Sequence, residues 1–267
     1  MTRTLREHIV RMTTQAGSGH PSSSMSAVEV VAALYFGGIM KYDAANAQWK
    51  DRDRFILSKG HAVPVLYAAM AEAGYFSTDK LMTLRELGSP LEGHPNMRRL
   101  PGIEASTGSL GQGLSLGVGH ALATRLDKLP SRVYVMMGDG ELGEGQVWEA
   151  VASAHKYKLS NLTAIVDQNG YQQTGSTHDV LDLTPIADKF AAFGWHTQTI
   201  EGNSLDPVLK AFDVALKVTD RPQVIVSKTR KGFGILPIME EEKDLNYHGK
   251  PLSPKLAEKA LALLAQS

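Results

Sequence analysis

The sequence predicts an α/β fold with a mainly parallel central sheet, and two patterns lead to this prediction. The first is a strand, turn, helix and strand succession: apolar runs at 133–137 and 162–166 flank an apolar helical pattern at 147–157. The second is the alternation that follows, with a strand at 195–200, a helix at 205–218 and a β-branched strand at 222–227. Strands joined by right-handed helical crossovers pair in parallel, so we expect these strands in one sheet.

Apolar spacing predicts the remaining helices. Leu5, Ile9 and Met12 mark an N-terminal helix that ends before the glycine-rich residues 17–21, and Ser22 to Ser24 are expected to cap the next helix. Further helices are expected at 28–35, 81–87, 186–193 and 256–264. Two more are expected to begin after the Gly60-His61 turn, which follows a short strand near 55–57, and after Gly111. Gly111, Gly113, Gly117, Ala121 and Ala123 are expected to let another helix approach closely, and Glu240 to Glu242 to form a solvated acidic run.

Composition limits the class of protein. The 267 residues are 43 % hydrophobic, enough for a substantial core, and 28 basic residues balance 28 acidic ones, which gives no sign of a nucleic-acid partner. Cysteine is absent, so disulfides and thiolate chemistry are excluded. The N-terminus lacks the apolar region of a secretory signal, and the most apolar stretch, 27–40, is too short to span a bilayer. We expect a soluble, cytoplasmic protein without repeats or linkers.

Polar residues follow the first two strands of the 132–175 segment. Gly138-Asp139-Gly140 ends one strand and Asn169-Gly170 follows the next, so parallel pairing predicts that Asp139 and Asn169 meet at one edge of the sheet. A carboxylate and a carboxamide are oxygen ligands suited to Mg²⁺ or Ca²⁺, and glycines with a helix start favour a bound anion. Each motif alone is also ordinary turn chemistry; the pair at the two ends of one unit favours a metal-bridged diphosphate site.

Several histidines lie in loops rich in helix breakers. His20 and His94 each stand between glycine and proline, and His61 follows Lys59-Gly60 at a helix start. A phosphate or hydroxylated substrate there would find N–H groups, with Lys59 and His61 as extra donors. The alternatives are a surface imidazole for His20 and a simple capped helix at 59–61. The run TGSLGQGLSLGVG at 107–119 is not a dinucleotide fingerprint, because Pro101-Gly102 breaks the approaching strand and the glycine spacing differs.

The same motifs resemble a known family. Gly-Asp-Gly followed about thirty residues later by Asn169 is similar to the signature of thiamine-diphosphate enzymes, and the runs GDGELGEG, SGHPS, RDRFILSKGHA, TGSLGQG, KTRKGFG and HGKPL resemble transketolases. The resemblance covers nearly every residue. It implies a three-layer α/β sandwich, the thiamine-diphosphate-binding fold, with residues 1–267 as a single diphosphate-binding (PP) domain.

The resemblance also implies site residues. The metal, Mg²⁺ with Ca²⁺ or Mn²⁺ as alternatives, would be held by side-chain oxygens of Asp139 and Asn169 and the main-chain carbonyl of Tyr171. Residues implied to contact thiamine diphosphate are Ser23, His61, Gly108, Ser109, Leu110, Asp139, Gly140, Glu141, Asn169, Tyr171, Gln173, Lys228 and His248. The implied catalytic residues are His20, His61, His94 and His248, expected to titrate near neutral pH, and Glu144 and Glu149, which would lie in an acidic chain at a dimer interface. The residue-level alternatives are helix N-terminal charge for the two glutamates and a solvated loop for 228–234.

The resemblance reaches only the first domain of a conventional transketolase. The pyrimidine-binding domain and the glutamate that bonds the aminopyrimidine ring are missing, so the sequence is either a fragment or one chain of a split enzyme. The terminal helix after HGKPL favours the split, and we expect an α2β2 heterotetramer that transfers a two-carbon ketol unit between sugar phosphates. The alternatives are a deoxyxylulose-phosphate synthase-like ketol transferase, a 2-oxo acid dehydrogenase α chain, against which the clustered histidine loops weigh, and a noncatalytic assembly subunit.

Overall fold

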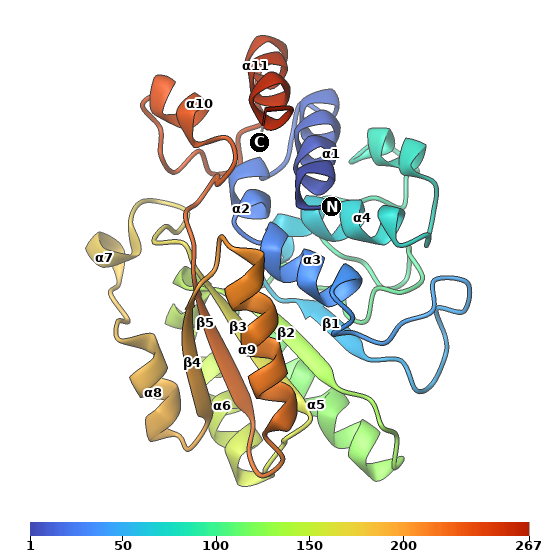
Figure 1. Ribbon diagram of the computed structural model, residues 1–267, viewed down its shortest axis with the longest axis vertical. Helices are drawn as coiled ribbons and strands as arrows, with labels where there is room; N and C mark the ends of the chain where they lie inside the picture. The colour runs from blue at the N-terminus through green and yellow to red at the C-terminus, as the bar shows by residue number, and fades with distance from the viewer. Residues whose placement is uncertain (267) are drawn as a thin grey trace.

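A five-stranded sheet with helices on both faces forms the centre of the molecule (Figure 1). The structure is a computed structural model that describes residues 1–266. The strand order is β1-β2-β3-β5-β4, and all four neighbouring pairs are parallel. The strands are β1 (Arg54–Leu57), β2 (Val133–Gly138), β3 (Leu162–Gln168), β4 (His196–Glu201) and β5 (Gln223–Lys228). The predicted α/β fold is confirmed, and the sheet is parallel throughout rather than mainly so.

Alternate residues of the strands face two separate cores. Tyr134 and Met136 of β2 belong to one hydrophobic cluster, whereas Val133, Val135 and Met137 belong to the other. Both sets are fully buried, as expected for a parallel strand that is covered on each face. The sheet is therefore the middle layer of a three-layer sandwich.

The two outer layers contain most of the long helices. In Figure 1, α9 lies in front of the sheet beside α3, and α5 and α6 lie behind it. The front cluster includes residues of α1 (Thr2–Gln15), α3 (Val28–Phe36), α4 (Val63–Glu72), α9 (Leu205–Lys217) and α11 (Pro254–Leu264). The rear cluster includes residues of α5 (Gln112–Leu126), α6 (Gly145–Lys156) and α8 (Ile186–Ala192). The shorter helices are α2 (Pro21–Met25), α7 (Thr177–Val180), α10 (Leu236–Glu241) and the 3₁₀ turns η1 (Gly60–Ala62), η2 (Thr78–Thr83) and η3 (Gly140–Gly143).

The small residues of α5 serve two neighbours: Gly113 and Gly117 face the sheet, whereas Gly111, just before the helix, lies against Glu144 and Gln146 at the start of α6, the helix that packs beside α5 as expected. A methyl group added at Gly117 would lie 2.4 Å from Cγ2 of Val135 in β2, and one added at Gly113 would lie 2.3 Å from Oγ of Ser58, just after β1. Gly111 precedes the helix with a left-handed φ of 82°. These glycines let α5 lie directly on β1 and β2, which places its N-terminus beside the carboxyl edge of the sheet.

Two other local predictions need correction. The helix expected at 81–87 is the 3₁₀ turn η2, which ends at Thr83 because Leu84 is buried in an extended conformation and Arg85 is left-handed. Ser22 to Ser24 lie inside α2 and make no side-chain cap for α3. The acidic run at 240–242 is exposed as expected, and it includes the end of α10, whose Ile238 and Met239 are buried.

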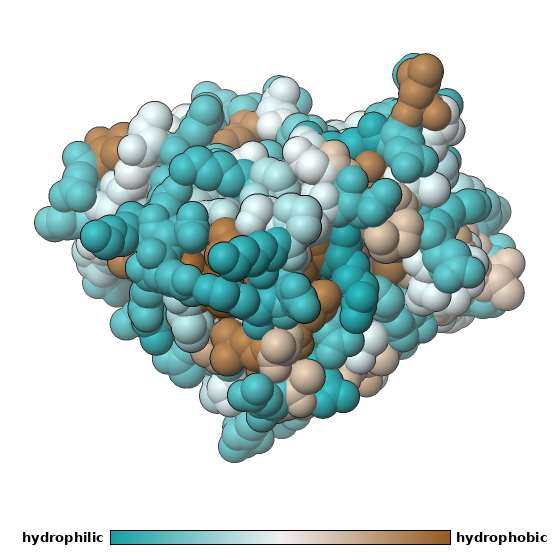
Figure 2. Space-filling model, turned by 90° about the horizontal axis from the view of Figure 1, so that it is seen from above, coloured by the Kyte–Doolittle hydropathy of each residue, from teal (hydrophilic) through white to brown (hydrophobic). Residues whose placement is uncertain are grey.

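The end of the molecule around α1, α10 and α11 carries a largely hydrophilic surface, with smaller hydrophobic groups between the polar side chains (Figure 2). Helix α1 packs against α11, so segments from the two ends of the described chain meet there (Figure 1). Within residues 1–266, no helix has the length and apolar character needed to cross a membrane.

Candidate functional site

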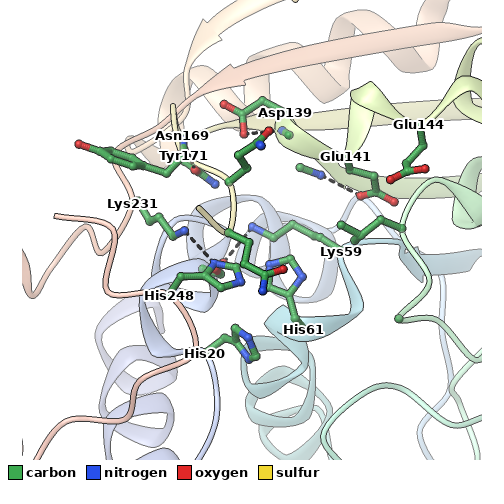
Figure 3. A pocket seen from close by; sticks show the side chains of 18 of the residues that line it. His20, Lys59, His61, Asp139, Glu141, Glu144, Asn169, Tyr171, Lys231 and His248 are labelled. Atoms are coloured by element: carbon green, nitrogen blue, oxygen red, sulfur yellow. Dashed lines mark hydrogen bonds between the residues drawn. The ribbon is translucent and has the colours of Figure 1, made fainter. Parts of the chain in front are cut away.

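A cavity of about 760 Å³ lies at the carboxyl edge of the sheet. Its walls come from the loops after β1, β2, β3 and β5 and from the two Gly-His-Pro segments, and Figure 3 shows the labelled side chains converging on it. The lining residues are His20, Ser23, Lys59, His61, His94, Gly108, Leu110, Gly138, Asp139, Gly140, Glu141, Glu144, Asn169, Tyr171, Gln172, Gln173, Lys231, His248 and Gly249. The cavity therefore lies where open parallel sheets bind their ligands.

Asp139 connects the loops that follow β2 and β3. Its Oδ1 accepts a hydrogen bond from the Gly140 N–H at 3.0 Å, and its Oδ2 accepts one from the Gly170 N–H at 2.7 Å. Burial, reinforced by the negative charge of Asp167, raises the pKa of Asp139 to about 6. The predicted meeting of the Asp139 and Asn169 loops is thus present in the structure, and this carboxylate lacks a cation of its own within hydrogen-bonding distance in residues 1–266.

The Asn169 side chain is held in a fixed orientation. Its Nδ2 donates to Oδ2 of Asp167 at 3.0 Å, and its Oδ1 accepts from the Tyr171 N–H at 3.1 Å. No group of three or more His, Cys, Asp or Glu side chains in residues 1–266 is arranged for a metal ion. A cation beside Asp139 would therefore depend on amide and main-chain oxygens and on oxygens of a bound ligand, the donor set that suits Mg²⁺ bound to phosphates.

A buried ion pair supports these loops and was not among the predicted site residues. Nζ of Lys59 donates to Oδ2 of Asp167 and to the Ser23 carbonyl at 2.9 Å, with the two charged side chains 1 % and 0 % exposed. Asp167 also accepts from Ser26 Oγ at 2.7 Å and from Thr229 Oγ1. Although burial alone would raise the pKa of Asp167, Lys59 and these hydrogen bonds lower it. The pair ties the loop after β1 to β3, β5 and α2.

Three histidines form a cluster opposite Asp139. The ring centroids of His20, His61 and His248 lie 4.9–5.3 Å apart (Figure 3). Nζ of Lys231 lies 3.0 Å from Nδ1 of His248 and donates to Oδ1 of Asn246 at 2.6 Å. An ammonium beside Nδ1 makes that nitrogen an acceptor, so the proton of neutral His248 lies on Nε2.

The surroundings keep these imidazoles neutral, which corrects the expectation that they titrate near pH 7. Burial and then the neighbouring His248 lower the pKa of His20 to about 3, and burial with Lys231 and Lys59 lowers that of His248 to about 4. The pKa of His61 is lowered by burial and by Lys59. Burial and the charge of Lys59 lower the pKa of Lys231 itself to about 8. The cluster therefore offers neutral donors and acceptors beside a cation.

Glu141 has a different environment from the other acidic residues of the cavity. Its Oε1 accepts from the Gly111 N–H at 2.8 Å and from Ser58 Oγ, and its Oε2 accepts from the Gly138 N–H at 3.0 Å. Both carboxylate oxygens are thus occupied, so this side chain joins the β1, β2 and α5 loops. Glu144 is exposed at the cavity wall, beside Gly111.

The structure brings all but three of the predicted site residues to the cavity. Ser109 is exposed in the loop before α5, Glu149 is exposed on α6, and Lys228 is exposed at the last position of β5. The buried Lys231 takes the place expected for Lys228, because a turn after β5 carries Lys231 back to His248. Gln172, Lys231 and Gly249 were not predicted, although Lys231 lies within a motif that was recognised; Lys59 was expected as a donor to a bound ligand, but its pairing with Asp167 was not.

A parallel α/β sheet with a carboxylate, an amide, a lysine and neutral histidines around one edge cavity has the polar groups and the location that suit a phosphorylated ligand. Residues 1–262 match the family described as transketolase, thiamine diphosphate binding domain. The chain therefore belongs to the transketolase family.

The chain is similar to known transketolases over nearly its whole length. It is 44 % identical over 248 residues to the 6-deoxy-6-sulfo-D-fructose transketolase subunit SqwG of Clostridium sp. (strain MSTE9), covering 93 % of this chain and 89 % of that protein. Identity to Homo sapiens transketolase is 42 % over 96 % of this chain, but only 40 % of that protein is covered. The solved transketolase of Campylobacter jejuni superposes with a TM-score of 0.90 at 30 % identity, over 99 % of this chain and 42 % of that one.

Proposed function

We propose that this chain is the cofactor-binding subunit of a split transketolase, which transfers a two-carbon ketol unit from a ketose phosphate to an aldose phosphate. The observation that supports this most directly is the cavity in which the Asp139–Asn169 loops face a cluster of three histidines. The lengths of the relatives support an enzyme divided between two chains. The alignment covers 89 % of the SqwG subunit but only 40 % of Homo sapiens transketolase.

The residues present fit thiamine diphosphate bound through a divalent cation. Asp139, Asn169 and the Tyr171 main-chain carbonyl would hold Mg²⁺, with the diphosphate beside Gly140 and within reach of Lys231. Burial is the main cause that raises the pKa of Asp139, and a bound cation would favour its charged form. The raised pKa therefore fits a carboxylate whose cation is supplied on binding. When bound, thiamine diphosphate supplies the carbon nucleophile that carries the two-carbon unit.

The histidines would bind and orient the sugar. Nε2–H of neutral His248 can donate to a carbonyl or hydroxyl oxygen, and His20 lies beside it in the wall of the cavity. A neutral imidazole donates a hydrogen bond through its N–H and accepts one through its other nitrogen, so these side chains can orient the carbonyl and hydroxyl groups of the sugar. His94, exposed at the cavity wall against Gly108, would contact the part of the substrate farther from Asp139.

A second chain would complete the site. Within residues 1–266, no side chain is assigned to the aminopyrimidine side of the cofactor, and we propose that a partner with the pyrimidine-binding domain supplies it in an α2β2 assembly. Glu144 at the cavity wall and Glu149 on the outer face of α6 would then face other chains of that assembly.

The test combines reconstitution with a choice of substrate. The chain alone should show no ketol transfer with xylulose 5-phosphate, and addition of the proposed partner with thiamine diphosphate and Mg²⁺ should restore it. Turnover by the chain alone at a normal rate would overturn the split assignment, and turnover of pyruvate instead would identify a 2-oxo acid dehydrogenase. Normal retention of thiamine diphosphate by an Asp139→Ala variant would overturn the site. Because SqwG is named for 6-deoxy-6-sulfo-D-fructose, that sulfonated ketose should be assayed in parallel.

A further inference from the structure

Two histidine loops of the cavity come from distant parts of the chain. Gly19-His20-Pro21 joins α1 to α2, and Gly93-His94-Pro95 lies between η2 and α5. Within residues 1–266, no hydrogen bond joins one loop directly to the other. Their relative position must therefore be set by a side chain between them or by packing alone.

Arg85 occupies the space between the two loops. Its Nη1 donates to Oγ of Ser18 at 2.8 Å, and its Nη2 donates to the Gly93 carbonyl over a longer 3.4 Å. These contacts reach the residues immediately before Gly19 and His94. A planar guanidinium with donors in a fixed fork can hold two acceptors at a set separation, which an ammonium does less well.

The chain around Arg85 is shaped to place this guanidinium. Arg85 has a left-handed φ of 61°, and its N–H donates to the Leu91 carbonyl at 2.8 Å. Leu84 and Leu91 on either side are buried, which anchors the exposed loop between them. A left-handed conformation is uncommon for a side chain as large as arginine, so these contacts must outweigh its cost.

Gly93 supplies an independent observation. A methyl group added there would lie 2.8 Å from both Cζ and Nη2 of Arg85, so the guanidinium rests against a position that only glycine leaves open. We propose that Arg85 is a positioning residue that fixes the His20 and His94 loops relative to each other at the cavity, in support of the ketol transfer proposed above.

The electrostatic surroundings agree with this placement. Burial is the main cause that lowers the pKa of His94, and the charge of Arg85 is the next largest. At His20, burial and then His248 lower the pKa most, and the charge of Arg85 lowers it further. His94 and Lys231 contribute in the same direction at His20. Removal of the Arg85 charge should therefore raise the pKa of both imidazoles.

The test compares Arg85→Gln with Arg98→Gln in the full chain. Arg98 is also exposed in this segment, and its side chain makes no hydrogen bond or ion pair within residues 1–266, so it controls for the loss of one charge. The nine histidines are labelled at Cε1, and the His20 and His94 signals are assigned with His20→Gln and His94→Gln. Arg85→Gln should shift both signals, broaden them and raise both pKa values, and Gly93→Ala should reproduce the shift and the broadening. If Arg85→Gln matches Arg98→Gln in these signals, the proposal is overturned.

Kinetics on the reconstituted assembly separate positioning from direct binding of the substrate anion. Positioning predicts that Arg85→Gln lowers kcat/KM about tenfold for a ketose phosphate and equally for the unphosphorylated ketose. A loss confined to the phosphorylated ketose would overturn the proposal in favour of an anion contact. Full recovery of rate and line width by Arg85→Lys would also overturn it, since charge alone would then suffice. If no ketol transfer is found even for the unsubstituted assembly, the proposed function fails, while the spectra still test the role of Arg85.

Discussion

Removing one partner of the buried pair between Lys59 and Asp167 should destabilise the protein far more than removing one partner of an exposed pair of the same residue types. An Asp167→Asn substitution preserves the size of the side chain but leaves the Lys59 charge buried without a counter-charge. Breaking a buried pair in this way costs about 3–5 kcal/mol. For a chain of this size, where each kcal/mol shifts Tm by about 2–4 °C, the melting temperature should fall by roughly 6–20 °C.

Helix α9 offers a matched control for this experiment. Lys210 and Asp206 form an ion pair of 2.7 Å one turn apart, with both side chains 72 % exposed. Asp206→Asn should change the free energy of unfolding by no more than about 0.5 kcal/mol, because exposed pairs of this kind contribute little. Urea unfolding of both variants, followed by circular dichroism, gives the comparison. Equal destabilisation by Asp167→Asn and Asp206→Asn would refute the reasoning.

A double variant and a pH series test the same pair further. Lys59→Met combined with Asp167→Asn removes both buried charges, so it should be less destabilised than the sum of the two single variants. The pKa of Asp167 is lowered in the folded state, because Lys59 and its hydrogen bonds outweigh burial. Its stabilisation is therefore present above the unfolded pKa of about 3.9 and is lost as the pH falls through the lowered folded pKa. An unchanged acid-unfolding curve in Asp167→Asn would contradict this.

Three further predictions concern the sheet and the site. Gly117→Ala should lower the free energy of unfolding by about 1–3 kcal/mol in chemical denaturation, since the added methyl group would meet Val135 at 2.4 Å. Gly119→Ala on the same helix, where the added methyl group has no atom within 4 Å, should raise that free energy by about 0.5–1 kcal/mol. A change of the same sign in both variants would be inconsistent with the packing described. His248→Ala should lower kcat about 10²-fold or more, with little change in Tm; a parallel loss of melting temperature and activity would indicate a structural role instead. Because the pKa of Asp139 is raised to about 6, cation-dependent binding of thiamine diphosphate should weaken as the pH falls below 6, by at least about tenfold per pH unit in calorimetric titrations. Asp139→Asn should bind more weakly and show a shallower slope, since only the terminal phosphate of the ligand then titrates in this range, and an equal slope in both proteins would count against Asp139 as a titrating ligand.

Local sequence patterns were sufficient to predict how the main loops of the site come together. A helical pattern between the apolar runs of β2 and β3 predicted that these two strands pair in parallel. The parallel pairing brings the Asp139 loop to Gly170. The prediction succeeded because it depended only on short-range periodicity and on the handedness of one crossover.

Contacts between distant segments could not be predicted in this way. The predicted strand ended at residue 166, but β3 continues through Asp167, its sixth residue, which is fully buried because Lys59 from the β1 loop lies against it. Lys228 and Lys231 are three residues apart in one basic run, and only the turn that follows β5 determines which of them faces the cavity. The spacing at 81–87 suggested a helix, but Arg85 adopts a left-handed conformation that its contacts with Leu91 and Ser18 help to stabilise.

The cavity is assembled from segments near both ends of the chain, since His20 follows α1 and His248 precedes α11. A partly folded chain therefore has no binding site, and occupancy by a cofactor is coupled to the global folding equilibrium. A ligand at 100 times its Kd would add about 2.7 kcal/mol to the stability of the native state. The supply of cofactor should accordingly influence how long each newly made chain survives proteolysis, before any question of turnover arises.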